Sequence, residues 1–207
     1  SRPLSWSRPS CREKRAGRSY VMKHGRAEEY QVPYASVDGH CSTARGAQQA
    51  TMVLANSSGA SVALTPGMRG WERLPENRYL PLLHALVERG PVAASVAARS
   101  WVTYGGGVFD GCSRDAVIDH AVVLVGYGED PRTKDAFFLL LNSWGPGWGE
   151  AGRIRLLRHA NDTAWCGTDD QPELGTGCRG GPENVTVCGM CGILYDSVVP
   201  HFSAPPA

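Results

Sequence analysis

Four short runs of apolar and β-branched residues, separated by glycine-rich turns, constrain the fold of the second half of this chain. The runs cover residues 92–97, 120–127, 136–141 and 152–157. Runs of this length bounded by turn residues are typical of β-strands. We therefore predict that these segments form an antiparallel sheet or a partial barrel.

One helix is predicted ahead of these strands, between residues 77 and 90. Its apolar residues recur at helical spacing, a proline falls in the first turn, and a Gly-Pro pair ends it. The residues concerned are Leu82, Leu83, Leu86 and Val87, with Pro81 near the start and Gly90-Pro91 at the end. A second, short helix is predicted to end at Gly25, where glycine suits a left-handed cap.

Size and charge exclude several classes of function. The chain has 207 residues, of which 42% are hydrophobic, so it can fill a packed core. Its formal net charge is +1, and no global field favours nucleic acid or an anionic membrane. The longest apolar stretches, residues 121–125 and 136–141, are far shorter than the roughly 20 residues needed to cross a bilayer. We therefore expect neither a nucleic-acid nor a membrane partner.

Seven cysteines in a chain of this size indicate disulfides and an oxidising compartment. Three Asn-x-Ser/Thr sequons, at Asn56, Asn161 and Asn184, agree with a secretory route. Residues 1–26 lack the apolar core of a signal peptide, so either that signal has been removed or the chain begins within something larger. We expect a secreted protein or one of the lysosome or vacuole.

Four of the cysteines lie close together near the C-terminus. They are Cys166, Cys178, Cys188 and Cys191. One disulfide among the first three is the favoured reading. The alternative is a four-thiolate zinc site, because the spacing between the last two is ligand-like.

A histidine and an asparagine mark the ends of two predicted strands. His120 opens one apolar run, and Asn142 closes the next. Antiparallel pairing can bring the two side chains together, and the asparagine carbonyl then accepts the second imidazole N–H. A base that activates a cysteine needs such an orienting partner, and a neutral one suffices because thiolate and imidazolium already form an ion pair. The indole of Trp144 would shield this hydrogen bond from water.

Several segments together resemble papain-like cysteine proteases of the cathepsin type. The segments are residues 119–128 (DHAVVLVGYG), 141–150 (LNSWGPGWGE), 29–34 (EYQVPY), 90–92 (GPV), 106–112 (GGVFDGC) and 191–194 (CGIL). The resemblance runs from about Ala16 to Pro200. It implies an α+β, papain-like fold, made mainly of the right-hand antiparallel β-barrel lobe with a remnant of the left-hand helical lobe. The expected division is 1–65 for the remnant with an irregular N-terminus, 66–202 for the β-barrel lobe and 203–207 for a tail.

The same resemblance implies roles for individual residues. His120 is the catalytic histidine and Asn142 its orienting partner. Cys112 pairs with Cys191, whereas Cys41 would find its partner near Cys11 or in an absent segment. The residues expected to line the substrate site are Trp144 and three that fall in the pocket for the second residue before the scissile bond, Asp119, Ala121 and Asp196. The carboxylate of the last would favour a Lys or Arg side chain, unless it is only a solvated turn residue.

The family's nucleophile motif is missing from the sequence. In this family the cysteine lies in Cys-Gly-Ser/Ala-Cys-Trp/Tyr, about 130 to 150 residues before the histidine, and counting back from His120 lands before residue 1. No such motif occurs in the 207 residues, and the glutamine that helps form the family's oxyanion hole is missing too. Cys11 could replace the missing nucleophile only poorly, because it lies about 22 residues before Pro33, where the family has a structural disulfide cysteine.

Two functions follow from these observations. The first is a papain-like cysteine endopeptidase that cleaves peptides or proteins without a metal or organic cofactor, of which this chain is a fragment or one chain. The nucleophile would then come from a missing N-terminal segment or from a second chain, and this chain alone would be inactive. The second is a non-catalytic papain-like homologue that serves as a binding or structural subunit.

Overall fold

The computed structural model describes residues 54–55, 61–62, 68–178 and 180–202. The chain divides into two compact units, and residues 72–199 belong to the first of them. The second unit contains the short strands β1 (Leu54–Ala55) and β2 (Ser61–Val62), which pair antiparallel. The helix predicted to end at Gly25 lies outside the described residues, and the predicted domain boundaries stay a prediction.

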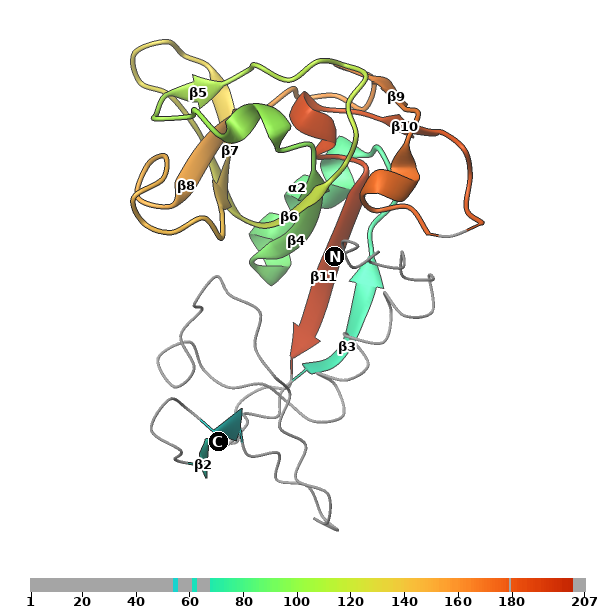
Figure 1. Cartoon of the computed structure of the whole chain (residues 1–207). Helices are drawn as coiled ribbons and strands as arrows, with labels where there is room; N and C mark the ends of the chain where they lie inside the picture. The colour runs from blue at the N-terminus through green and yellow to red at the C-terminus, as the bar shows by residue number, and fades with distance from the viewer. Residues whose placement is uncertain (1–53, 56–60, 63–67, 179, 203–207) are drawn as a thin grey trace, which may run out of the picture. The chain divides into compact units, whose positions relative to one another are not determined.

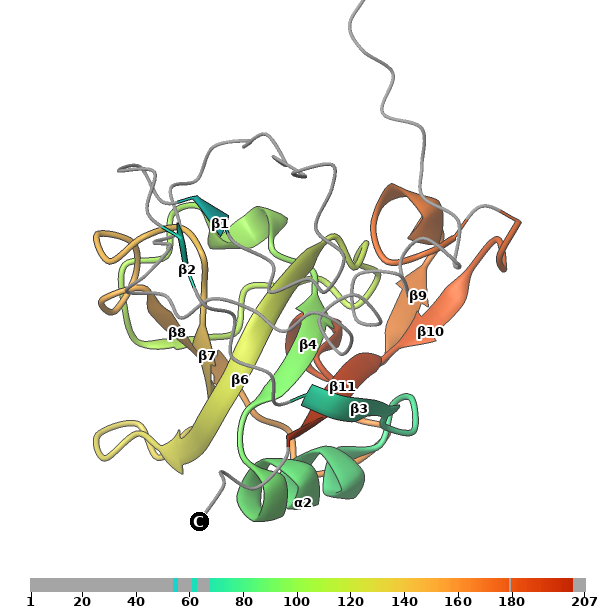
Figure 2. The same cartoon turned by 90° about the horizontal axis from the view of Figure 1, so that it is seen from below.

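A seven-stranded sheet in the order β3-β11-β4-β6-β7-β8-β5 is the main element of the fold (Figures 1 and 2). Pairing is antiparallel from β11 through β4, β6 and β7 to β8, whereas β5 joins β8 in parallel. The strands are β3 (Met68–Arg73), β4 (Val92–Val96), β5 (Val108–Phe109), β6 (His120–Glu129), β7 (Ala136–Leu141), β8 (Arg153–Leu157) and β11 (Asp196–Phe202). All four predicted strands are present, and the α+β class is confirmed.

Helix α2 (Tyr79–Arg89) occupies the predicted segment. It is followed by Gly90, whose φ of 94° suits glycine. Arg78, the residue just before the helix, makes no capping hydrogen bond with its side chain. Instead Asp162, from a distant loop, accepts a hydrogen bond from the Tyr79 N–H at 2.7 Å. The same carboxylate pairs with Arg78 at 2.7 Å, and these two donors hold the pKa of Asp162 below its ordinary value.

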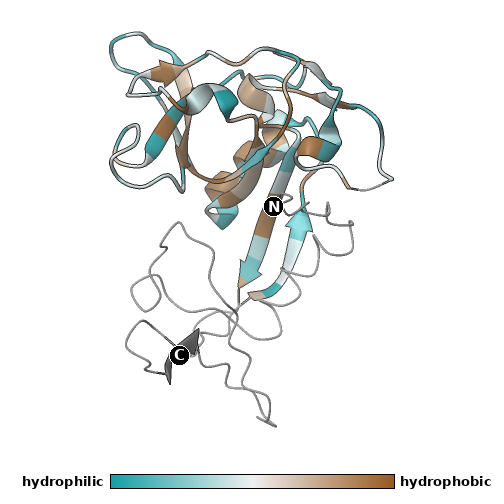
Figure 3. Ribbon diagram, in the orientation of Figure 1, coloured by the Kyte–Doolittle hydropathy of each residue, from teal (hydrophilic) through white to brown (hydrophobic). Residues whose placement is uncertain are grey.

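The hydrophobic core lies between α2 and the sheet. Leu82, Ala85 and Leu86 of the helix are buried in one cluster with Val92, Leu124 and residues of every other long strand except β3. In Figure 3 the hydrophobic residues of β11 form a band in the middle of that strand, where Val198 and Val199 are buried. The helix, the strands β4, β6, β7 and β8, and the first part of β11 are therefore packed in one unit.

Short elements complete the described chain. The 3-10 helices are η1 (Arg99–Trp101), η2 (Pro172–Leu174) and η3 (Met190–Gly192), and the strands β9 (Gly167–Asp169) and β10 (Val185–Val187) form a separate two-stranded sheet. Figure 1 shows β9 and β10 side by side. They belong to a loop, residues 166–188, closed by the Cys166–Cys188 disulfide.

The cysteines near the C-terminus form disulfides, so the zinc alternative is wrong. Cys112 pairs with Cys191, as the family resemblance implies, and Cys166 pairs with Cys188. Cys178 is disulfide-bonded as well. Within the described ranges no group of three or more His, Cys, Asp or Glu side chains is arranged to hold a metal ion.

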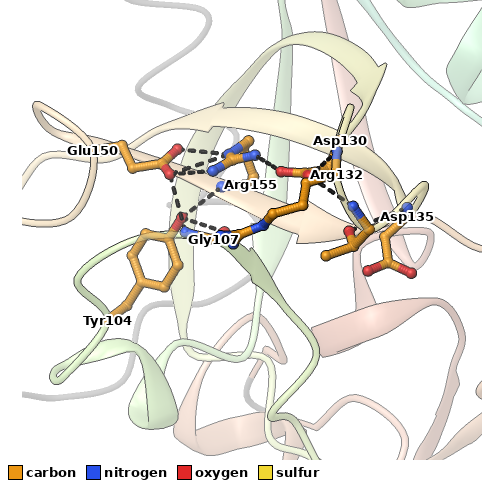
Figure 4. A network of polar contacts seen from close by, with 8 residues as sticks. Tyr104, Gly107, Asp130, Arg132, Asp135, Glu150 and Arg155 are labelled. Carbon is orange, nitrogen blue, oxygen red and sulfur yellow. Dashed lines mark hydrogen bonds and ion pairs between the residues drawn. The ribbon is translucent and has the colours of Figure 1, made fainter.

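The guanidinium of Arg155 on β8 joins three loops (Figure 4). It donates to both carboxylate oxygens of Glu150, one of them at 2.8 Å, and to Asp130. Glu150 also accepts the Gly107 N–H at 3.0 Å, and Tyr104 donates its hydroxyl to the carbonyl of Gly107 at 2.7 Å. The Arg155 guanidinium, directly or through Glu150, thereby anchors three loops, which follow Tyr104, Glu129 and Leu141.

The pKa values of this cluster reflect the hydrogen bonds. Backbone N–H groups of Thr133 and Arg132, together with Arg155, lower the pKa of Asp130 from 3.8 to about 2. Hydrogen bonds from Arg155 lower the pKa of Glu150 as well. Carboxylates with a depressed folded pKa stabilise the fold above their ordinary pKa and lose that contribution as pH falls through the folded value.

Acid unfolding tests this linkage. Asp130→Asn removes the depressed carboxyl group, so the free energy of unfolding of the variant should fall less steeply than that of the parent chain between about pH 4 and pH 2. Urea denaturation at a series of pH values measures the slope. Asp135→Asn, an exposed carboxylate in the same turn, is the matched control and should retain the parental slope. An unchanged slope in Asp130→Asn would contradict the assignment.

Candidate active site

Strand pairing brings His120 and Asn142 together. His120 is the first residue of β6, and Asn142 directly follows the last residue of β7. Val123 lies opposite Leu141 in the β6–β7 ladder. Continuing that register by one residue places Asn142 beside the N-terminal end of β6, within reach of the imidazole.

The two side chains are hydrogen-bonded. The distance from His120 Nε2 to Asn142 Oδ1 is 2.8 Å. The same oxygen accepts the backbone N–H of Ser143 at 2.8 Å, which identifies it as the carbonyl oxygen of the amide. Because a carbonyl oxygen can only accept, Nε2 carries the proton, and in the neutral ring Nδ1 is left as the basic nitrogen. Asn142 is only 8% exposed, so this hydrogen bond is shielded from water.

Two tryptophan side chains contact the imidazole, and a third packs against both of them. The ring centroid of Trp144 lies 5.2 Å from that of His120, and Trp101 meets the histidine edge-on at 6.5 Å. Trp148 stacks on Trp101 at 6.3 Å and contacts Trp144 at 5.0 Å. Trp148 also donates its indole N–H to the carbonyl of Trp101 at 3.1 Å. The rings hold one another and restrict the positions open to His120.

The remaining predicted site residues lie on nearby strands. Across β11, β4 and β6, the register places Asp196 opposite Ser95 and Ser95 opposite Ala121. Directly opposed residues share a face of the sheet, so these three side chains form a row on one face, and Ala121 at the end of the row directly follows His120 in β6. Asp119 directly precedes the histidine and caps the backbone N–H of Ala98 at 3.0 Å.

Both acidic residues are already paired. The carboxylate of Asp196 accepts hydrogen bonds from Arg73 at 3.1 Å and from the Ser95 hydroxyl at 2.8 Å. Asp119 accepts one from Arg99 at 3.0 Å. Asp196 is therefore a bonded group of the sheet and not a solvated turn residue, and a substrate cation would compete with Arg73 for it.

Sequence reasoning missed three residues that support the site. Trp101 packs against His120, Trp148 packs against Trp101, and Asp169 bonds to the segment just before the histidine. The spacing Trp144-x-x-x-Trp148 was a visible signal that two indoles could stack near the asparagine. Nothing in the local sequence pointed to Trp101 or to Asp169.

None of the described cysteines offers a free thiol. All five of them, Cys112, Cys166, Cys178, Cys188 and Cys191, are disulfide-bonded. Cys11 and Cys41, and with them the predicted pairing of Cys41, lie outside the described residues. The described part of the chain thus holds a histidine and an asparagine in the geometry of a base and its orienting partner, without a nucleophile.

Comparison with known proteins agrees with this geometry. A family profile described as papain family cysteine protease matches residues 13–176. The chain belongs to the papain family of cysteine proteases. Cysteine protease 1 of Oryza sativa subsp. japonica is 34% identical over 154 residues, which is 72% of this chain and 28% of that protein. A cathepsin L-like protein of Caenorhabditis elegans is 40% identical over 98 residues, or 45% of this chain and 28% of that protein.

Solved structures of the papain family share the fold. The bromelain protease from Ananas comosus, determined with the E64 inhibitor, superposes with a TM-score of 0.58 at 25% identity, covering 89% of this chain and 67% of that one. Digestive procathepsin L 3 of Tenebrio molitor gives a TM-score of 0.57 at 26% identity, over 90% and 47% of the two chains. The chain spans less than a third of the length of the rice and nematode relatives.

In the described ranges, α2 and the shorter helices do not have the length and apolar character that a bilayer crossing requires.

Removing the central indole tests the packing around the histidine. Trp101 is 0% exposed, and Trp101→Ala should lower the free energy of unfolding by about 3–5 kcal/mol because it leaves a large cavity. Urea denaturation measures the change. Val102→Ala alters the next residue, which is 70% exposed, and should stay within about 0.5 kcal/mol of the parent. A loss for Trp101→Ala no larger than that of the control would refute a structural role for this ring.

Proposed function

We propose that this chain carries the base and its orienting partner of a papain-like cysteine endopeptidase, with His120 and Asn142 in those roles. The observation that carries the proposal is the 2.8 Å hydrogen bond from His120 Nε2 to Asn142 Oδ1. That bond leaves Nδ1 free of the orienting interaction and available to a thiol. Membership of the papain family supports the same reaction class.

In the proposed mechanism Nδ1 of His120 takes the proton of a cysteine thiol. The resulting thiolate attacks the carbonyl carbon of the peptide bond, and the imidazolium returns its proton to the leaving amine as the C–N bond breaks. Water then attacks the thioester with the imidazole as base, which releases the acid and regenerates the thiol. Asn142 keeps the ring in the required tautomer through both stages.

The nucleophilic cysteine is assigned to residues other than these 207, either an N-terminal segment or a second chain. Two observations support this assignment: the sequence lacks Cys-Gly-Ser/Ala-Cys-Trp/Tyr, and every described cysteine is in a disulfide. On this proposal the chain alone is inactive. The disulfides also favour an oxidising location, namely the lysosome, the vacuole or the outside of the cell.

A second candidate is a non-catalytic homologue used as a binding or structural subunit. The same missing motif favours it. The reading frame upstream of Ser1 discriminates the two candidates. A Cys-Gly-x-Cys-Trp motif in frame supports the peptidase, whereas a start codon and a signal peptide adjoining Ser1 support the non-catalytic homologue.

The substrate is proposed to be a peptide that lies along the row formed by Asp196, Ser95 and Ala121. Asp119 would line the pocket for the second residue before the scissile bond, together with Ala121 and Asp196, and Trp144 would border the scissile bond because its ring lies against His120. Asp196 is the specificity residue in this proposal. Its pairing with Arg73 offsets the carboxylate charge and limits its attraction for a basic side chain.

Releasing that carboxylate should change specificity. In the enzyme that includes the nucleophile, Arg73→Gln should raise the relative kcat/KM for Lys or Arg at the second residue before the scissile bond by roughly tenfold, since a charge-assisted pair becomes available to substrate. Peptide libraries measure the preference. Arg132→Gln, in an exposed turn, should leave it unchanged. An equal preference in Arg73→Gln and the control would remove Asp196 from the specificity site.

The base is tested by substitution in the same enzyme. His120→Ala should lower kcat/KM for peptide hydrolysis by about 10²–10⁴-fold, because general acid–base catalysis is lost, and Asn142→Ala should cause a smaller loss. His84→Ala replaces an exposed histidine of α2 and should keep parental activity. A covalent protease inhibitor that requires an activated catalytic thiol should label the enzyme with the nucleophile and not the 207-residue chain. Full activity of His120→Ala would end the proposal.

A further inference from the structure

The Cys166–Cys188 loop (residues 166–188) packs on the segment that leads into His120. That segment, residues 110–119, contains no helix or strand, so its backbone N–H and C=O groups cannot be satisfied by a ladder of their own. Buried polar groups of such a segment need partners elsewhere. The loop supplies them at several points.

The first contacts lie at the beginning of the loop. Thr168 donates its backbone N–H to the Asp115 carboxylate at 2.8 Å. Gly167 approaches so closely that a Cβ there would lie 2.2 Å from the carbonyl oxygen of Arg114. Only glycine fits at that position, and β9 therefore runs directly against the segment.

Asp169 makes the most direct contact with the approach to His120. Its carboxylate accepts the backbone N–H of Ile118 at 3.0 Å through one oxygen and that of Gln171 at 2.9 Å through the other. The residue is 0% exposed. A buried carboxylate is costly unless it is hydrogen-bonded, and here it is bonded to the backbone of Ile118, two residues before the proposed base.

The other polar group of Ile118 is held by the same loop. The backbone N–H of Thr176 donates to the carbonyl of Ile118 at 3.0 Å. Gly175 lies against this peptide, where a Cβ would come within 1.8 Å of the Ile118 oxygen and 2.8 Å of the Asp119 Cα. The loop thus binds both backbone polar groups of Ile118, its N–H and its C=O. Ile118 lies two residues before His120.

We propose that Asp169 is a positioning residue for His120. Through the Ile118 peptide it sets the position at which β6 begins, and so holds the imidazole where Asn142 can bond it. The importance of this position for catalysis rests on the proposed function of His120. The positional effect itself can be measured on this chain without any activity.

The test uses the full chain, uniformly labelled with ¹⁵N, and compares Asp169→Ala with Asp170→Asn. The control changes the adjacent aspartate, which is exposed. In Asp169→Ala the exchange of the Ile118 amide and of the His120 Nε2 proton with water should both accelerate by at least about tenfold, since local opening governs such exchange. In Asp170→Asn both should remain within about twofold of the parent. Asp169→Asn, which keeps one carbonyl acceptor, should fall between them.

The two protons separate a positioning role from a merely structural one. Faster exchange at Ile118 with unchanged exchange at His120 Nε2 would overturn the proposal, because Asp169 would then only stabilise its own loop. Where Asp169→Ala does not fold, Asp169→Asn decides. If neither variant folds, the residue serves the fold as a whole and the proposal fails. Absence of His120-dependent hydrolysis in the longer enzyme would refute the proposed function but not this exchange result.

Discussion

The hydrogen bond between the imidazole of His120 and the carboxamide of Asn142 is the interaction on which the proposed chemistry depends. An imidazole can act as a base only through an unprotonated nitrogen, and the neutral ring offers two tautomers. The Ser143 N–H identifies the acceptor as the amide oxygen of Asn142, and this oxygen in turn places the histidine proton on Nε2. The geometry therefore selects the nitrogen as well as the ring position.

The surrounding structure holds this pair from several directions. The β6–β7 ladder sets the two backbone positions. The indoles of Trp101 and Trp144 pack against the histidine, and that of Trp148 packs against these two. Arg155 fixes the far end of the loop that carries Asn142 through Glu150. Each of these contacts comes from a different stretch of the chain, so the site is a product of the whole sheet and not of one loop.

The parts predictable from sequence were those with a local or periodic signal. Alternating turns and apolar runs predicted the strands, and strand ends predicted that His120 and Asn142 could meet. Contacts made by residues distant in sequence gave no such signal. The bond from Asp169 to the Ile118 N–H and the pairing of Asp196 with Arg73 each join segments whose local patterns are unremarkable. The sequence also left a zinc site open, which only the observed disulfide pairing excluded.

The tautomer of His120 tests the central claim most directly. Long-range ¹H–¹⁵N correlation spectra, recorded where the histidine rings are neutral, distinguish a protonated Nε2 from a protonated Nδ1. A ring protonated on Nε2 in the parent chain, with a mixture of tautomers in Asn142→Ala, is the result expected from the hydrogen bond described above. Protonation of His120 on Nδ1 in the parent chain, or the same tautomer in the parent chain and in Asn142→Ala, would contradict the arrangement from which the proposed function follows.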